Sequence, residues 1–207
     1  MSTLAWELAP TSPRSAARAG FQVACAVAGS LMIAGLAQIA IPLPFTPVPI
    51  TGQTLGVLLV GAAFGPALGA ATLGLYLLEG GIGLPFFADA SSGWAVLGLA
   101  SATGGYLWGF VAAAALVGWL ARQGWDRSFR SAIGAMLLGE VVLYTVGLVW
   151  LHRALPAFTG GPVTVQDTLV AGLYPYVIGD MIKLLLAAGL LPGAWRLLRG
   201  LRPDRGV

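Results

Sequence analysis

The sequence around residue 180 is Tyr174-Pro175-Tyr176-Val177-Ile178-Gly179-Asp180-Met181-Ile182-Lys183. It places an acid and the only lysine of the chain three residues apart, within apolar sequence that continues to Leu191. Positions i and i+3 share one face of a helix, so Asp180 and Lys183 are predicted to lie side by side. Ionisable residues at membrane depth face a protein interior or a wet cavity. The pair therefore either presents opposite charges to a polar guest or is an ion pair that only holds two helices together.

The composition indicates an integral membrane protein. The 207-residue chain is 57% hydrophobic and 9% charged, with a mean hydropathy of +0.85, whereas a soluble domain carries about 25% charged residues. The net charge is +3, but the basic residues cluster at loop ends, as membrane topology requires, and do not indicate nucleic-acid binding. Cys25 is the only cysteine, which excludes an intramolecular disulfide, and no Cys/His cluster suggests a metal site. We expect an all-α membrane protein with a single domain.

Six apolar segments are predicted to span the membrane. They are Phe21–Ile41, Thr54–Phe64, Pro66–Leu78, a segment that follows Thr103-Gly104-Gly105-Tyr106 and ends near Ala121, Ser131–Leu151, and a last segment from Tyr174 to about Leu191. The first has 21 residues, enough to cross about 30 Å at 1.5 Å per residue. A short outer helix is also expected, starting at Thr164 and ending near Gly172.

The arginines decide the topology, because positive loops stay cytoplasmic. Arginines precede the first segment, follow the fourth at positions 122 to 130, and follow the last. Only a hairpin at Gly65-Pro66, which makes residues 54–78 cross twice, places all these arginines on one side and leaves Arg153 outside. We therefore expect both termini in the cytoplasm. The expected parts are an N-terminal tail (1–20), a six-helix membrane domain (21–192) and a basic C-terminal tail (193–207).

The stretch from residue 42 to residue 53 is apolar but is not predicted to be helical. Prolines at positions 42, 44, 47 and 49 exclude a regular helix and favour extended backbone. Such backbone is tolerated near a bilayer where protein or a cavity covers it. Thr46, Thr51 and Gln53 would supply hydroxyl and amide groups to a cavity under this stiff loop. The alternative is a plain connector.

Residues 79–101 form a second expected outer loop, which is apolar and rich in glycine and aromatic residues. This composition is typical of a lid over a pocket, although Trp94 also suits the aromatic belt at the membrane interface. The paired glycines Gly104 and Gly105 would free backbone N–H groups to face a guest. Glu140 lies in the middle of the fifth segment, with Tyr144 four residues later. It is either a second polar wall of the pocket or a neutral packing acid.

Four motifs, taken in their order along the chain, resemble the BioY family, the biotin-specific S subunits of energy-coupling-factor (ECF) transporters. They are Ile41-Pro42-Leu43-Pro44-Phe45-Thr46-Pro47-Val48-Pro49-Ile50-Thr51-Gly52-Gln53-Thr54, Gly83-Leu84-Pro85-Phe86-Phe87-Ala88, Thr103-Gly104-Gly105-Tyr106-Leu107-Trp108-Gly109-Phe110 and Gly179-Asp180-Met181-Ile182-Lys183. The resemblance covers about residues 21–190. It implies a six-helix S-component bundle that captures biotin from outside the cell.

The resemblance also implies roles for individual residues. Lys183 suits the carboxylate of biotin as a cation with three donors, and Asp180 suits the urea N–H groups as an acceptor. The other residues implied at the site are Thr51, Gln53, Phe45, Tyr76, Phe86, Asp89, Trp94, Gly104, Gly105 and Tyr106. Some relatives carry an arginine after the Gly-Gly-Tyr motif, where this chain has Leu107, so Lys183 is implied as the sole cation.

The implied partners are biotin, a transmembrane coupling subunit, two ATPase subunits and the lipid bilayer of a bacterial cytoplasmic membrane. Ala24 and Ala28 resemble the small-residue face by which S subunits dock on the coupling subunit. The chain has no Gly-x-x-x-x-Gly-Lys-Ser/Thr loop, no nucleophile set and no cofactor motif, so we expect no enzyme activity. A self-sufficient secondary transporter, in which Glu140 or Asp180 relays protons, is the alternative function.

Overall fold

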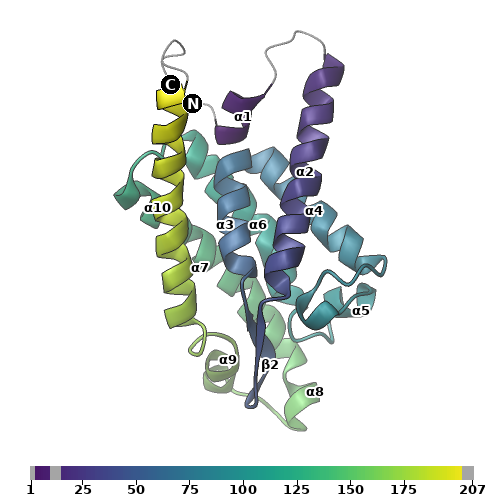
Figure 1. Cartoon of the computed structure of the whole chain (residues 1–207). Helices are drawn as coiled ribbons and strands as arrows, with labels where there is room; N and C mark the ends of the chain where they lie inside the picture. Colours follow the sequence, from purple (N-terminus) through teal and green to yellow (C-terminus); the bar gives the residue numbers. More distant parts are fainter. Residues whose placement is uncertain (1–2, 10–14, 202–207) are drawn as a thin grey trace.

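The structure, a computed structural model, describes residues 3–9 and 15–201. Six long helices make up the bundle: α2 (Ser15–Ala37), α3 (Gln53–Phe64), α4 (Pro66–Gly81), α6 (Gly104–Arg122), α7 (Phe129–Ala154) and α10 (Val177–Leu201). The shorter elements are α1 (Leu4–Leu8), β1 (Ala40–Leu43), β2 (Thr46–Thr51), η1 (Ala88–Ala90), α5 (Trp94–Leu97), α8 (Pro156–Thr159) and α9 (Val165–Gly172). The strands, α8 and α9 lie at one end of the bundle, and the termini lie at the other (Figure 1).

Four of these helices are long and apolar enough to cross a membrane: α2, α6, α7 and α10. α3 has 12 residues and α4 has 16. At 1.5 Å per residue, these helices measure about 18 and 24 Å, less than the hydrocarbon core. All six predicted segments are helical, but the count of six crossings stays a prediction. Three of the arginines on which the topology prediction depends, at positions 14, 202 and 205, lie outside the described residues.

The turn between α3 and α4 confirms the predicted hairpin at Gly65-Pro66. α3 ends at Phe64 and α4 begins at Pro66, where proline suits the first helical position. Gly65 has a φ of 82°, which a side chain would strain. A Cβ placed on Gly118 of α6 would lie only 2.4 Å from the carbonyl carbon of Gly65. The two glycines therefore let α6 pack directly against this turn.

The expectation of a purely α-helical protein is wrong in one place. Residues 40–51 form an antiparallel hairpin of two strands, so the fold is mostly helical with a small sheet. The register pairs Ala40 with Thr51, Ile41 with Ile50, and Leu43 with Thr46. No proline belongs to a pair, so the missing N–H groups fall between the paired positions. The extended backbone predicted for this stretch is correct, but the pairing of its two halves was not predicted.

The ends of the first and last helices differ from the predicted segments. α2 begins at Ser15, within the expected tail, and stops at Ala37 because the hairpin starts at Ala40. α10 begins at Val177 and continues through Pro192 to Leu201, past the predicted end near Leu191. Its last turns are anchored, since the indole nitrogen of Trp195 donates to the carboxylate of Asp126 over 2.5 Å. This contact, made with the loop before α7, explains why the helix does not stop at the proline.

The predicted short outer helix is confirmed as α9, which ends at Gly172. Thr164 caps its N-terminus, accepting a hydrogen bond from the backbone N–H of Asp167, while the Asp167 side chain accepts from the Thr164 backbone. Hydrogen bonds from the hydroxyl group and the backbone N–H of Thr164 lower the pKa of the Asp167 carboxyl group. α9 packs beside the hairpin and fixes the end of the bundle at which the predicted site lies.

Candidate functional site

A cavity of about 60 Å³ lies beneath β2, between the hairpin and the helices α3, α6, α7 and α10. Its lining residues are Val48, Pro49, Thr51, Thr54, Tyr106, Phe110, Leu143, Tyr144, Tyr176, Asp180 and Lys183. They come from four separate parts of the chain, which the bundle brings together near its hairpin end (Figure 1). The hairpin thus covers a cavity, as predicted for residues 42–53.

Asp180 and Lys183 contribute the charges of this cavity. The Lys183 ammonium lies 2.7 Å from an Asp180 carboxylate oxygen, which confirms the predicted side-by-side placement of the pair. Asp180 lies in the first turn of α10 and is only 6% exposed, and Lys183 is partly buried. A buried carboxylate needs a cation or several hydrogen bonds to remain charged, and Lys183 supplies the cation.

Two hydroxyl groups from other helices also bind the Asp180 carboxylate. Thr54 of α3 donates to the oxygen that Lys183 contacts, over 2.9 Å, and Tyr144 of α7 donates to the second oxygen. A carboxylate accepts about four hydrogen bonds. With three donors in place, Asp180 keeps one acceptor position for a guest. It gains a second when Lys183 turns to another anion.

A chain of hydrogen bonds connects the cavity to the segment after α4. The Thr51 hydroxyl donates to the side-chain oxygen of Gln53 over 2.9 Å, and the Gln53 amide donates to the Tyr76 hydroxyl over 2.7 Å. Tyr76 in turn donates to the carbonyl of Phe86 over 3.0 Å. Thr51 lines the cavity, whereas Gln53 and Tyr76 are buried behind it. The two predicted outer segments are therefore joined through polar side chains.

Two tyrosines hold the roof of the cavity, which is formed by the hairpin and the end of α9, through hydrogen bonds. Tyr176 donates to the carbonyl of Val48 in β2 over 2.6 Å, and Tyr106 donates to the carbonyl of Gly172 over 2.8 Å. Both rings line the cavity. A Cβ on Gly147 would lie 2.4 Å from the Tyr106 ring, so this glycine of α7 makes room for it. The hairpin and the end of α9 are thus held over the cavity by groups that themselves face it.

Several residues implied at the site by the family resemblance lie elsewhere. Phe45 is 62% exposed and lines a separate groove beside α8 and α9. Asp89 is exposed and has a φ of 55°. Trp94 is 57% exposed and packs on Gly81. Phe86 is partly buried and packs against the core. None of the four is among the described residues that line the cavity.

The paired glycines are placed between helices. A Cβ on Gly105 would lie 2.1 Å from the Cβ of Trp150, and one on Gly104 would lie 3.2 Å from the indole nitrogen of Trp150. Gly105 therefore faces α7 and permits α6 and α7 to pack closely, while a Cβ on Gly104 would also lie 3.1 Å from the carbonyl oxygens of Val96 and Gly98. Tyr106, the next residue, is the member of this motif that reaches the cavity.

Sequence reasoning missed three polar residues that face the cavity: Thr54, Tyr144 and Tyr176. Tyr176 had a signal, since it precedes Asp180 by one helical turn within the same stretch. Tyr144 and Thr54 are 36 and 126 residues away from Asp180, so only the fold brings them to its carboxylate. The apolar wall made by Phe110 and Leu143 was likewise not predicted.

Glu140 does not line the cavity. It is 7% exposed, and neither carboxyl oxygen has a hydrogen-bond partner among the described residues. It lies close enough to Asp180 and Lys183 to interact electrostatically with both. A buried acid without partners is costly to keep charged. The structure therefore places Glu140 behind the charged pair, without the hydrogen bonds expected of a packing acid.

The cavity combines an acceptor, a cation, several hydroxyl groups and apolar walls. This set suits a small, partly apolar guest that offers N–H donors to the acceptor and an anionic group to the cation. The described lining residues include no cysteine, serine or histidine, and the lining hydroxyls of Thr54 and Tyr144 donate to the Asp180 carboxylate. The arrangement is one for binding.

The sequence of the chain is similar to those of known proteins. The BioY family matches residues 11–200. The biotin transporter BioY of Thermotoga maritima is 33% identical over 148 residues, which cover 72% of this chain and 81% of that protein. The biotin transporter BioY of Rhizobium etli is 34% identical over 156 residues, covering 72% and 78%.

The fold also matches a solved structure, the S-component for biotin from an ECF-type ABC transporter. The TM-score is 0.72, and the match covers 94% of this chain and 97% of that one at 24% identity. At that identity the likeness establishes the fold, and the sequence matches establish the family. With four apolar helices long enough to span a bilayer and a match over most of its length, this chain is a multi-pass membrane protein that belongs to the BioY family.

Proposed function

We propose that the protein captures biotin in the cavity beneath the hairpin and carries it across the membrane. The observation that supports this most directly is the Asp180–Lys183 pair, which lines a cavity and is not turned to lipid. Both residues lie on α10, so the ion pair by itself does not join two helices. The named relatives, which are biotin transporters, supply the identity of the guest.

The chemistry of biotin fits the two ends of the pair. The urea ring has two N–H donors, and Asp180 has one acceptor position that is not filled by its three donors. The valerate carboxylate attracts the Lys183 ammonium, which then leaves the Asp180 oxygen and frees a second acceptor position. Phe110 and Leu143 contact the thioether ring and the chain. The guest thus exchanges one ion pair for two sets of charge-assisted hydrogen bonds.

The cavity widens to admit this guest, because ligand pockets commonly measure about 300–1,000 Å³ and this one measures about 60 Å³. The roof is the part able to move, since it is a two-stranded hairpin held mainly through Tyr176 and Thr46. Residues 79–101 flank the same end: the Gln38 amide, just after α2, donates to the carbonyl of Phe87 over 3.2 Å. We infer that residues 42–53 and 79–101 together close over biotin.

The proposed topology places the hairpin end outside and both termini in the cytoplasm, with six crossings. Arg18, Arg122 and Arg196 lie at the end of the bundle where the termini lie, and Arg153 lies at the hairpin end, which agrees with the positive-inside rule. The membrane is the cytoplasmic membrane of a bacterium. In this topology the short helices α3 and α4 each cross the membrane once, and the chain reverses direction between them at Gly65.

Delivery to the cytoplasm is proposed to require an ECF coupling subunit and two ATPase subunits. The docking face is Ala24 and Ala28, which are both exposed on α2. Gly29 of the same helix differs from them, because a Cβ there would lie 2.7 Å from Thr72 of α4. Gly29 therefore packs inside the bundle, and the two alanines remain available for a partner helix.

Direct titration of the detergent-purified chain tests the proposal. We expect calorimetry to show saturable binding of biotin and none of riboflavin or thiamine at the same concentrations. Absence of biotin binding, or equal binding of all three vitamins, would contradict biotin capture.

Glu140 favours a second candidate, a self-sufficient proton-linked transporter. A buried acid without a hydrogen-bond partner inside a membrane helix is a typical proton-carrying group. Uptake of labelled biotin by cells without any coupling ATPase, abolished by a protonophore and by Glu140→Gln, supports this candidate. Uptake that depends on the coupling ATPases and resists a protonophore rejects it.

A further inference from the structure

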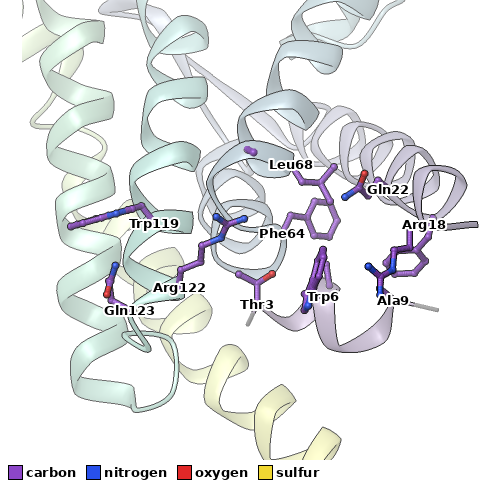
Figure 2. Close-up of a pocket in the computed structure, with 13 residues that line it drawn as sticks. Thr3, Trp6, Ala9, Arg18, Gln22, Phe64, Leu68, Trp119, Arg122 and Gln123 are labelled. Atoms are coloured by element: carbon purple, nitrogen blue, oxygen red, sulfur yellow. The ribbon is translucent and has the colours of Figure 1, made fainter. Parts of the chain in front are cut away.

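A larger cavity, of about 720 Å³, lies at the other end of the bundle, near the chain termini (Figure 2). It is enclosed by α1, the first turns of α2, the α3–α4 turn and the end of α6. Its lining residues are Thr3, Ala5, Trp6, Ala9, Arg18, Phe21, Gln22, Phe64, Ala67, Leu68, Trp119, Arg122 and Gln123. The biotin site shares none of these residues.

Two arginines, Arg18 of α2 and Arg122 of α6, line this cavity from different helices. Arg18 and Gln22 lie four residues apart and so share one face of α2, and Arg122 follows Trp119 by three residues on α6. In Figure 2, Arg18 and Arg122 appear on either side of Trp6 and Phe64. The cavity therefore has a guanidinium on each wall, with aromatic rings between them.

Both arginines are exposed, and each guanidinium lies beside a neighbouring group of the cavity. That of Arg18 lies 5.4 Å from the centre of the Trp6 ring. The Nε atom of Arg122 lies beside Gly65, where an added Cβ would approach it to 3.3 Å. Stacking on an aromatic ring holds the face of a guanidinium and leaves its N–H edge for a phosphate. The arginines are thus arranged as phosphate ligands would be.

The other lining residues indicate an amphipathic guest. Phe21, Phe64 and Leu68 form an apolar side, which a soluble phosphate would not use. The described lining residues include no aspartate or glutamate, although Glu7 follows Trp6 in α1. An anionic head attached to apolar chains satisfies both sides of the cavity.

We propose that this cavity binds the headgroup of an anionic phospholipid from the cytoplasmic leaflet. In the proposed topology this end of the bundle faces the cytoplasm, where anionic lipids attract basic pockets between helices. The occupant is a lipid of the surrounding bilayer, and its binding is independent of biotin. The inference uses the proposed orientation but not biotin capture, so the two proposals can fail separately.

Native mass spectrometry of the full chain tests the proposal. The chain is released from micelles that hold equal amounts of phosphatidylglycerol and phosphatidylcholine with identical acyl chains. We expect phosphatidylglycerol to be retained preferentially. Arg18→Gln with Arg122→Gln should reduce its affinity about fivefold per arginine, or roughly 25-fold for the pair. Equal retention of the two lipids, or an unchanged preference in the double variant, overturns the proposal.

Matched variants separate this site from general surface charge. Arg130→Gln with Arg196→Gln removes two exposed arginines from the same end of the bundle, outside the cavity, and should keep the preference. Arg18→Lys with Arg122→Lys should retain part of the preference for phosphatidylglycerol. An unchanged melting temperature in phosphatidylcholine shows that each variant is folded. Displacement of the lipid by inorganic phosphate at a comparable concentration overturns the proposal in favour of a phosphate site. A lipid preference that the control variant loses equally overturns it as well.

Discussion

Tyr144 on α7 donates a hydrogen bond to the same Asp180 carboxylate that Lys183 holds, so the acid of the cavity is fixed from two helices. Thr54 adds a third donor from α3. Because each donor comes from a different direction, the orientation of Asp180 toward the cavity does not depend on its ion pair alone. This arrangement makes the contributions of the cation and of the hydroxyl groups separable by substitution.

Lys183→Ala should weaken biotin far more than a biotin amide that lacks the carboxylate charge. Removing one partner of a buried charge pair costs about 2 kcal/mol or more, at least roughly 30-fold in affinity. Calorimetric titration of both ligands measures the difference. Arg153→Ala, at the exposed end of α7, is the control and should leave both affinities unchanged. Equal losses for the two ligands would show that Lys183 does not bind the carboxylate.

Tyr144→Phe should lower the thermal stability of the purified protein. The substitution leaves one Asp180 oxygen without its donor, and an unsatisfied buried acceptor costs about 1–3 kcal/mol, more when it is charged. Tyr174→Phe is a matched control, because Tyr174 is half exposed. Thermal melts in the same detergent compare the two variants. Identical melting temperatures would mean that the Tyr144 hydroxyl does not stabilise Asp180.

Glu140→Gln should leave the affinity for biotin within about twofold and should not reduce stability. Both carboxyl oxygens are buried and have no hydrogen-bond partner within residues 3–9 and 15–201, and replacing such an acid by a neutral group of similar size is often neutral or stabilising. Titration and thermal melts measure the two quantities. A tenfold loss of affinity would instead identify Glu140 as a wall of the occupied pocket.

Gly105→Ala should destabilise the protein by about 1–3 kcal/mol or more, because the added Cβ would lie 2.1 Å from the Cβ of Trp150. Gly74→Ala is the control, since nothing lies within 4 Å of a Cβ there and alanine favours a helix by up to about 1 kcal/mol. Thermal melts should therefore move in opposite directions. A tolerated alanine at position 105 would mean that α6 and α7 are farther apart than described.

Ala24→Trp and Ala28→Trp should spare biotin binding but abolish uptake in cells that contain the coupling module. Both alanines are exposed, so a bulky side chain blocks a partner helix without disturbing the bundle. Val23→Trp, on a neighbouring exposed face of α2, should retain uptake. Reduced binding in the alanine variants would place this face inside the protein, and normal uptake would place the docking surface elsewhere.

Local sequence features predicted much of this fold. The turn at Gly65-Pro66, the capped helix after Thr164 and the shared face of Asp180 and Lys183 each depend on residues within a few positions of one another. Their backbone geometry is fixed by proline, glycine and capping chemistry. The structure confirms all three.

Features that depend on distant contacts were not predicted. The last segment was expected to end near Leu191, but α10 continues to Leu201, and its Trp195 binds Asp126, which is 69 residues away. Phe45 was assigned to the pocket by its motif, yet it lies in the turn between β1 and β2 and lines the groove beside α8. Thr54 and Tyr144 reach Asp180 because of the way in which three helices pack. A periodic pattern does not specify which helix faces meet.

The hydrogen bonds from Thr51 through Gln53 and Tyr76 to Phe86 give the segment after α4 a mechanical connection to the cavity. A guest that binds the Thr51 hydroxyl breaks the hydrogen bond from Thr51 to Gln53. The hydrogen bonds that hold the segment around Phe86 are thereby weakened. Occupancy would thereby be felt at Phe86, which is not among the described residues that line the cavity. Any subunit, inhibitor or antibody that senses this segment can distinguish a loaded carrier from an empty one.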